Sequence, residues 1–315
     1  MSTDAFPVEV RFDQPKPPLQ ERALDIEEVV RLVTRAGAVV LRGLSLSAPE
    51  FEAFTRAFCG RFYISGVRHK GQMAKSGSHD GYTTRLRGSE FGILSHSEAA
   101  YLQEQPEVCF FHCEVPTQLP GGETCLVDGL AFYRQISAGL RKRLYRHGII
   151  YHMLWERPRW QAQYGTESEI KVAQFLDQYP QMSYQFTREG LRLSVKSPAI
   201  QKSEGGRLIF LNGILSHLPE VKHPNYAPGS VYCNANNWLT YGNGTCLSNA
   251  DISELIDIHD RILVPHRWQK NDVLIIDNRQ VLHGRICPSP NDDRVLLSRF
   301  GWFHEKFRSF PVGTH

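Results

Sequence analysis

The chain has 315 residues, of which 41% are hydrophobic and 22% are charged, and its formal net charge is +3. This composition is ordinary for a folded protein, and so small a net charge argues against nucleic acid or a membrane surface as the partner. We therefore expect a small-molecule partner. The first residues show no signal-peptide pattern, and no apolar run approaches the ~18 residues of a membrane span, which predicts a cytoplasmic protein.

The seven cysteines are scattered and none has the C-x2-C spacing of zinc ribbons or redox sites, so reduced thiols are expected. Cys109 and Cys113 lie on either side of His112 in an apolar run. In a strand, alternation would put both sulfurs on one face and the imidazole on the other. This pattern favours buried strand cysteines over a metal site.

The first predicted helix follows Asp25 as its N-cap and ends at Gly37. Residues 38–43 then form an apolar run that is typical of a buried strand. A capping box at 47–50, with proline in the first turn, predicts a short helix with three phenylalanines on one face.

Residues 60–90 are rich in Gly, Ser, Arg, Tyr and His without a sustained period. We predict a long loop that could act as a lid over an active site. Helical patterns return over 130–147 and after a capping box at 166–169. Short extended runs are expected at 191–195, 207–211, 231–233, 262–264, 273–276 and 295–303.

Many short strands with helices outside them predict a mainly β fold with α decoration, either a β-sandwich or a jelly-roll barrel. The sequence contains neither an internal repeat nor a G-x-G-x-x-G or P-loop pattern. One continuous domain over 1–315 is therefore the expected organisation.

His96 and Glu98 have the i, i+2 spacing that places two side chains on one face of a strand, where they could hold one metal ion. Alone the pair is weak, because a histidine bonded to a nearby carboxylate explains it equally well. A buried strand at 273–276 runs on toward a further histidine, His283. Two histidines and a carboxylate form the facial triad of non-haem Fe(II) oxygenases, which leaves three coordination positions open.

Together with four further stretches, this pattern resembles the Fe(II)/2-oxoglutarate-dependent oxygenases of the taurine dioxygenase (TauD/TfdA) type. The resemblance covers most of the chain, and the order and spacing of the pieces are more specific than any one of them. From His96 to Asp128 the chain is most similar to the SyrP-like hydroxylases of natural-product pathways. The matching pieces are 37–43, His96-Ser-Glu98, 120–124, Asp277-Asn-Arg with His283, and Arg294.

The resemblance implies a double-stranded β-helix, or jelly roll, of the cupin-like kind. His96, Glu98 and His283 would bind Fe(II), a metal that accepts imidazole and carboxylate ligands. The guanidinium of Arg294 and the hydroxyl of Thr124 would hold the far carboxylate of 2-oxoglutarate.

Asn278 or Asp277 could orient ligands from outside the metal's own coordination shell, although either could also simply cap a strand end. Glu98 stands where the commoner family pattern has Asp, and halogenating relatives have Gly or Ala there, so Glu98 argues against halogenation. Some relatives carry a substrate-binding Arg at the position of Ser298. Here Arg299 is one residue later, which reverses the side of the strand, so that role is not transferred.

The activity implied is an O2-dependent oxidation in which 2-oxoglutarate is decarboxylated to succinate and CO2. Hydroxylation of an unactivated C–H is the usual outcome, and desaturation or cyclisation remains an alternative. The SyrP-like resemblance implies an amino-acid or peptide-derived substrate, free or carrier-bound, in specialised metabolism. We expect contacts to it from Arg85, Arg87 and Asn236, although solvent-facing arginines are an equal alternative.

Two other readings use the same residues. A zinc hydrolase could keep a water beside His96, Glu98 and His283, and a non-catalytic jelly-roll module could bind a ligand without chemistry. Arg294 and Thr124 argue against the hydrolase, which has no need of a clamp for a dicarboxylate, and a module without chemistry would not need all three metal ligands.

Overall fold

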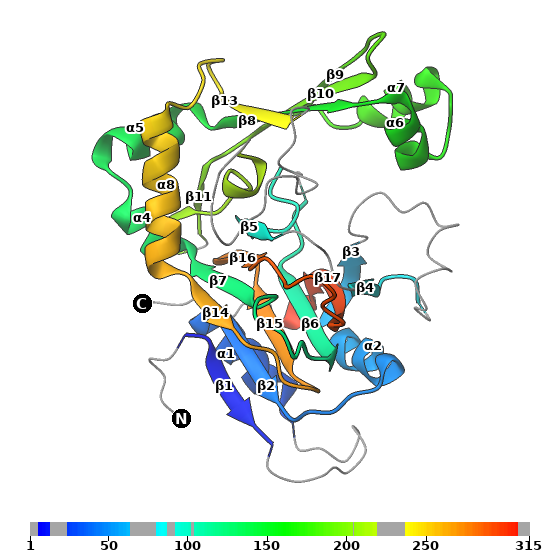
Figure 1. Cartoon of the computed structure of the whole chain (residues 1–315), viewed down its shortest axis with the longest axis vertical. Coiled ribbons are helices and arrows are strands. Elements are labelled where there is room, and N and C mark those ends of the chain that lie inside the picture. The colour runs from blue at the N-terminus through cyan, green and yellow to red at the C-terminus, as the bar shows by residue number, and fades with distance from the viewer. Residues whose placement is uncertain are drawn as a thin grey trace.

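The structure is a computed structural model that describes residues 6–12, 24–63, 80–86, 92–101, 104–203, 205–218 and 237–307. Two β-sheets pack face to face in its lower half, and a third sheet runs across the top (Figure 1). The strands β1 and β2 pair in parallel, whereas the other described pairs are antiparallel. None of the helices in these ranges combines the length and the apolar character needed to cross a membrane.

The larger sheet has the strand order β1-β2-β15-β6-β17-β3, with β4 also paired to β17. Its central strands read as continuous apolar runs because both of their faces are covered. The strands are β1 (Val8–Arg11), β2 (Ala38–Arg42), β3 (Cys59–Tyr63), β4 (Thr84–Leu86), β6 (Val108–Val115), β15 (Val273–Asp277) and β17 (Val295–Phe303).

The smaller sheet has the order β14-β7-β16-β5 and packs on the first across a shared apolar core. Phe111 and Phe300 enter this core from the larger sheet, and Leu126 and Val281 enter it from the smaller one. The strands are β5 (Ile93–His96), β7 (Thr124–Asp128), β14 (Val264–His266) and β16 (Val281–Arg285). Two facing sheets, antiparallel apart from the β1–β2 pair, with helices outside confirm the predicted jelly roll.

Helices cover the outer faces of both sheets (Figure 1). Those on the larger sheet are α1 (Ile26–Ala36) and α2 (Ala48–Arg56), and those on the smaller are α4 (Gly129–Gln135), α5 (Ala138–His147) and α8 (Asn249–Ile262). The predicted caps are confirmed: Asp25 accepts two backbone N–H groups of α1, and Ser47 forms a reciprocal capping box with Glu50.

The third sheet has the order β13-β8-β10-β9 and carries two short helices on one side. A two-stranded ribbon, β11 with β12, and two 3₁₀ turns complete the described part. The elements are β8 (Ile149–Trp155), α6 (Arg157–Tyr164), α7 (Glu169–Leu176), β9 (Met182–Phe186), β10 (Leu191–Ser197), β11 (Ile200–Lys202), β12 (Leu208–Phe210), η3 (Leu215–His217), β13 (Asn237–Tyr241) and η4 (Glu305–Phe307).

Several sequence predictions differ from the structure. The helix predicted over 130–147 is two helices, because the chain takes an extended conformation at Ile136 and restarts with Ser137 as a new N-cap. The helix placed after Thr166 is capped by Ser168 instead. Of the extended run predicted at 262–264, Ile262 is the last residue of α8, a 14-residue helix that the prediction missed, whereas Leu263 is extended and Val264 begins β14. The strand predicted at 231–233 lies outside the described residues.

The loop predicted for 60–90 is partly a packed structure. Its two ends are the strands β3 and β4, both of which pair with β17. Residues 64–79 and 87–91 lie outside the described part of the chain. The predicted alternation in β6 is confirmed: Cys109 and Cys113 are buried in the core between the sheets, and His112 stacks on Phe51 on the opposite face.

Candidate functional site

Three candidate metal ligands meet at the edge where β5 and β16 pair. His96 lies directly opposite His283 in this ladder, and their ring centroids are 4.8 Å apart. Glu98 lies in the turn after β5, where its Oε2 is 3.9 Å from the Nε2 atom of each histidine. One ligand atom from each of the three residues falls within a span of 4.8 Å.

Each of the two imidazoles can offer a nitrogen lone pair to a metal. The Nδ1 of His96 is 3.1 Å from the Leu94 carbonyl oxygen. A carbonyl can only accept, so Nδ1 carries the hydrogen in the neutral ring and Nε2 carries the lone pair. Burial, with a smaller contribution from His96, lowers the pKa of His283 well below its usual value. His283 is therefore neutral at neutral pH, and this is the form that binds a metal.

Asn278 fixes the backbone that carries Glu98. Its Oδ1 accepts from the Glu98 N–H at 2.8 Å and from the Ser97 hydroxyl at 3.1 Å. Its Nδ2 donates to the carbonyls of Glu98 at 3.0 Å and Pro106 at 2.8 Å. The side chain is 1% exposed and follows the end of β15. It thus ties a core strand to the ligand-bearing turn, consistent with its predicted orienting role.

A cavity of about 170 Å³ extends from the three candidate ligands into the space between the sheets. Arg294 and Thr124, to which the family resemblance gave a shared role, line the same cavity. Its remaining described lining is mostly apolar and comes from five strands, β4, β5, β6, β16 and β17: Thr84, Leu86, Ile93, Phe111, Gly284, Arg285, Leu296, Ser298 and Phe300.

Arg294 is only 2% exposed, and burial lowers its pKa without discharging it. One terminal N–H donates to the Gly122 carbonyl, and its Nε is 3.8 Å from an Asp292 carboxylate oxygen. That Nε has no hydrogen-bond acceptor among the described residues. A buried guanidinium with unused donors suits an anionic ligand.

Thr124 contributes a hydroxyl whose oxygen already accepts a hydrogen bond. The indole Nε1 of Trp268 donates to Thr124 Oγ1 at 3.1 Å. The hydroxyl hydrogen of Thr124 therefore remains available to point at an acceptor in the cavity. Trp268 was not predicted to touch the site. The sequence around it shows only an aromatic residue shortly before a strand, which does not indicate a functional role.

Arg85 does not join the site. Its neighbours Thr84 and Leu86 line the cavity, so strand alternation turns Arg85 to the other face of β4, where it pairs with Glu114. The structure therefore argues against the predicted substrate contact of Arg85. Arg87 and Asn236 lie outside the described residues. Asp277 bonds Arg279 rather than the ligands.

The reversal expected between positions 298 and 299 is confirmed. Ser298 lines the cavity, whereas Arg299 is fully buried on the opposite face of β17. There Arg299 donates to both carboxylate oxygens of Asp80 at 2.8 and 2.7 Å, and to the Thr83 hydroxyl at 2.8 Å. Sequence reasoning missed the cavity residues of β17, although the alternation of 296, 298 and 300 carried the signal.

Comparison with known proteins identifies the family. Residues 2–300 match the family described as "Taurine catabolism dioxygenase TauD, TfdA family". The chain belongs to this family. It is an oxidoreductase of the Fe(II)- and 2-oxoglutarate-dependent dioxygenase class, with O2 as co-substrate. Two imidazoles and one carboxylate, held within 4.8 Å, fit an Fe(II) ion that retains open positions.

The individual relatives share limited sequence identity with this chain. A clavaminate synthase-like protein from Arabidopsis thaliana is 27% identical over 285 residues, which are 85% of this chain and 82% of that protein. PvcB from Pseudomonas aeruginosa has a TM-score of 0.56 at 15% identity, covering 93% of this chain and 84% of PvcB. A taurine dioxygenase from Burkholderia xenovorans has a TM-score of 0.53 at 15% identity, covering 93% and 85%. These structural likenesses support the shared fold.

Proposed function

We propose that this dioxygenase hydroxylates an unactivated C–H of an amino-acid or peptide-derived small molecule, with His96, Glu98 and His283 as its iron ligands. The observation that carries the proposal is one cavity that holds these three side chains together with Arg294 and Thr124. A metal-ligand triad alone would also suit a zinc hydrolase. The additional guanidinium and hydroxyl would suit a dicarboxylate co-substrate, which a hydrolase does not need, and a binding module without chemistry would not need all three metal ligands.

Each residue has a distinct task in this proposal. His96, His283 and Glu98 hold Fe(II) from one side, so that three positions face the cavity. Arg294 donates charge-assisted hydrogen bonds to the far carboxylate of 2-oxoglutarate, and the Thr124 hydroxyl donates to the same group. Iron with 2-oxoglutarate supplies the oxidising power of the reaction, as O2 is consumed and succinate and CO2 are released.

The other side chains around the cavity orient the metal ligands and exclude water from them. Asn278 fixes the Glu98 turn by four hydrogen bonds, so the carboxylate keeps its place relative to the two rings. The rings of Phe111 and Phe300 and the side chain of Leu296 form an apolar wall. Such a wall excludes water, which strengthens the bonds that Arg294 makes.

The substrate class rests on the relatives and on the SyrP-like resemblance. One structure of PvcB is described as that of an Fe, alpha-ketoglutarate dependent oxygenase from an isonitrile synthetic pathway. A specialised-metabolite substrate, free or carrier-bound, follows by analogy. Desaturation or cyclisation is the second candidate outcome, because both begin with the same removal of hydrogen. Residues 60–90 remain a predicted cover for the cavity, supported by the position of Thr84 and Leu86 in its wall.

Anaerobic addition of Fe(II) and 2-oxoglutarate to the purified protein tests the ligand assignment. Chelation of iron by 2-oxoglutarate gives a weak visible charge-transfer band, which we expect with the wild type and with His147→Ala. His147 is the matched control, because it lies at the end of α5 and does not line the cavity. His96→Ala should abolish the band. An unchanged band in His96→Ala would refute the assignment.

The substrate class needs a separate assay. Amino acids and short peptides should be tested for stimulation of succinate formation, with product mass separating a gain of one oxygen from a loss of two hydrogens. If the charge-transfer band forms but no member of the panel stimulates turnover, the iron site stands and the proposed substrate class is wrong.

A further inference from the structure

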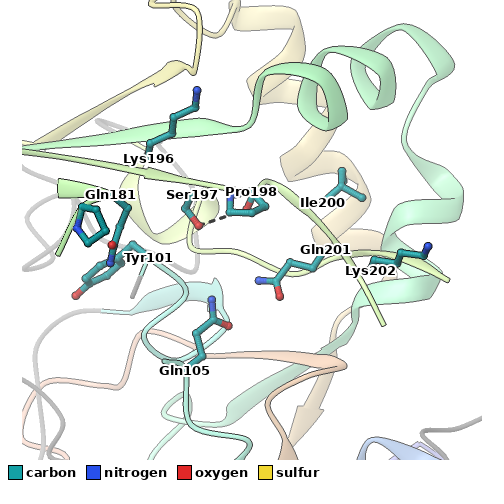
Figure 2. A pocket seen from close by; sticks show the side chains of 10 residues that line it. Tyr101, Gln105, Gln181, Lys196, Ser197, Pro198, Ile200, Gln201 and Lys202 are labelled. Carbon is teal, nitrogen blue, oxygen red and sulfur yellow. Dashed lines mark hydrogen bonds between the residues drawn. The ribbon is translucent and has the colours of Figure 1, made fainter. Parts of the chain in front are cut away.

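The metal cavity is separate from a larger groove in the described structure. This groove, of about 590 Å³, is lined by Tyr101 and by residues of β10 and β11 (Figure 2). The two share no described lining residue. Selection of a co-substrate at the metal therefore depends on the walls of the metal cavity and on the side chains that support those walls.

The Thr124 hydroxyl has to act as a donor if it is to bind the far carboxylate of 2-oxoglutarate. An ionised carboxylate can only accept hydrogen bonds, whereas a threonine hydroxyl can donate or accept, and its hydrogen rotates to suit its surroundings. A hydroxyl without a fixed direction would have to be reoriented when the co-substrate binds. A neighbour that fixes its hydrogen would therefore favour the carboxylate.

The indole of Trp268 is such a neighbour. Its Nε1–H donates to Thr124 Oγ1 at 3.1 Å, and both residues are buried. The indole hydrogen takes up one lone pair of the oxygen, so the hydroxyl hydrogen has to point away from Trp268. Thr124 Oγ1 donates to no described residue, which leaves this hydrogen for a ligand. Accepting the indole bond also polarises the O–H and strengthens its donation.

Trp268 is itself held in place by its surroundings. The ring of His266 packs against the indole at an interplanar angle of 85°, with the ring centroids 4.5 Å apart. In the turn that follows, the fully buried carboxylate of Asp272 accepts from the Gln269 N–H at 2.9 Å and from the Arg42 guanidinium at 2.6 Å. The donor that orients Thr124 is thus preorganised, and its direction need not change when a ligand binds.

Arg294 is tied to the same segment of chain as Thr124. One of its terminal N–H groups donates to the carbonyl of Gly122, two residues before Thr124, and its Nε has no acceptor among the described residues. We propose that Trp268 is a positioning residue that makes Thr124 a dedicated donor, and thereby favours 2-oxo acids with a second carboxylate over those without one. This inference rests on the proposed function, which assigns Arg294 and Thr124 to 2-oxoglutarate.

A double-mutant cycle on the full chain tests the inference. Anaerobic titration of the charge-transfer band with 2-oxoglutarate gives the affinity of each variant. Thr124→Val keeps the shape of the side chain and removes the donor, and should weaken binding about tenfold. Trp268→Phe keeps a buried ring and removes only the indole donor, and should weaken binding about fivefold. The double variant should again be about tenfold weaker, because Trp268 acts through the Thr124 hydroxyl.

If the bond merely satisfied a buried indole, the two substitutions would act independently. The double variant would then bind about 50-fold more weakly than the wild type, and this result would overturn the inference. Replacement of the tryptophans by benzothienylalanine, in which sulfur takes the place of N–H in a ring of the same shape, removes the donor without the risk of misfolding. It should weaken 2-oxoglutarate binding by the same factor of about five.

Two controls separate orientation of the hydroxyl from general damage to the site. Trp160→Phe alters a buried tryptophan of the third sheet and should leave the affinity for 2-oxoglutarate unchanged. 2-Oxobutyrate has the same chelating end but no second carboxylate, so wild type and Trp268→Phe should bind it equally. Equal weakening of both 2-oxo acids in Trp268→Phe would overturn the inference.

Failure of this inference is distinguishable from failure of the proposed function. Absence of the band in the wild type, or an unchanged affinity in Thr124→Val, would contradict the proposed function. A band in the wild type that Thr124→Val weakens and Trp268→Phe does not would overturn only the role of Trp268.

Discussion

Replacement of Asn278 by alanine should both destabilise the protein and loosen its metal site. The substitution removes four hydrogen bonds of 2.8 to 3.1 Å from a side chain that is 1% exposed. It leaves the Glu98 N–H and the carbonyls of Glu98 and Pro106 without this partner. At about 1 kcal/mol for each lost bond, the free energy of unfolding should fall by about 4 kcal/mol.

Urea unfolding monitored by circular dichroism measures this loss, and Asn249→Ala is the matched control. Asn249 is exposed at the start of α8, so its replacement should change stability by less than about 0.5 kcal/mol. Anaerobic titration with Fe(II) in the presence of 2-oxoglutarate should show about tenfold weaker metal binding in Asn278→Ala, as for other groups that orient a metal ligand. A loss below 1 kcal/mol together with unchanged Fe(II) affinity would refute the reasoning.

Three further predictions test other parts of the structure. Arg294→Met should weaken 2-oxoglutarate binding about 100-fold, because the variant loses the charge-assisted hydrogen bonds to the co-substrate. Titration of the charge-transfer band with 2-oxoglutarate measures this affinity. A change below threefold would contradict the role assigned to Arg294. Asp80→Asn should reduce the free energy of unfolding by about 3 kcal/mol, because it leaves Arg299 buried without its main counter-charge. The control Arg56→Ala removes the exposed partner of Asp80 and should reduce the free energy of unfolding by less than about 1 kcal/mol. Equal losses for the two variants in urea unfolding would be inconsistent with a buried Asp80–Arg299 pair. Burial lowers the pKa of His217 to about 4, so the unfolded chain binds more protons and stability should fall by up to about 1.4 kcal/mol per pH unit between pH 6.5 and 4, but not above. His217→Gln should flatten this fall in urea unfolding at stepped pH, and an identical slope in both proteins would disprove the attribution.

Local signals in the sequence predicted local structure well. Asp25 and Ser47 cap their helices as expected, because an N-cap depends on a side chain and the backbone two or three residues away. The same kind of signal was overlooked at Ser248, which forms a capping box with Asp251 and starts α8. The break at Ile136 was missed because the apolar spacing continues through it. These errors concern boundaries and one helix, not the fold class.

Predictions that depended on which way a side chain faces were less secure. Arg85 was a reasonable substrate contact while 60–90 was treated as a loop. Pairing of β4 with β17 assigns Arg85 to the face opposite the cavity. Such pairing joins residues more than 200 positions apart, and a single sequence gives no measure of it.

The sequence by itself determined the kinds of ligand atoms available to this protein: two imidazoles, a carboxylate two residues from one of them, a guanidinium and a hydroxyl. It also determined the family, because the order and spacing of these residues are properties of the chain. The tertiary structure decided that His283 lies opposite His96, that Asn278 holds the Glu98 turn, and that Thr124 and Arg294 share one cavity. The physical reason is that each of these contacts depends on sheet pairing and packing between distant segments, which only the folded chain brings within bonding distance.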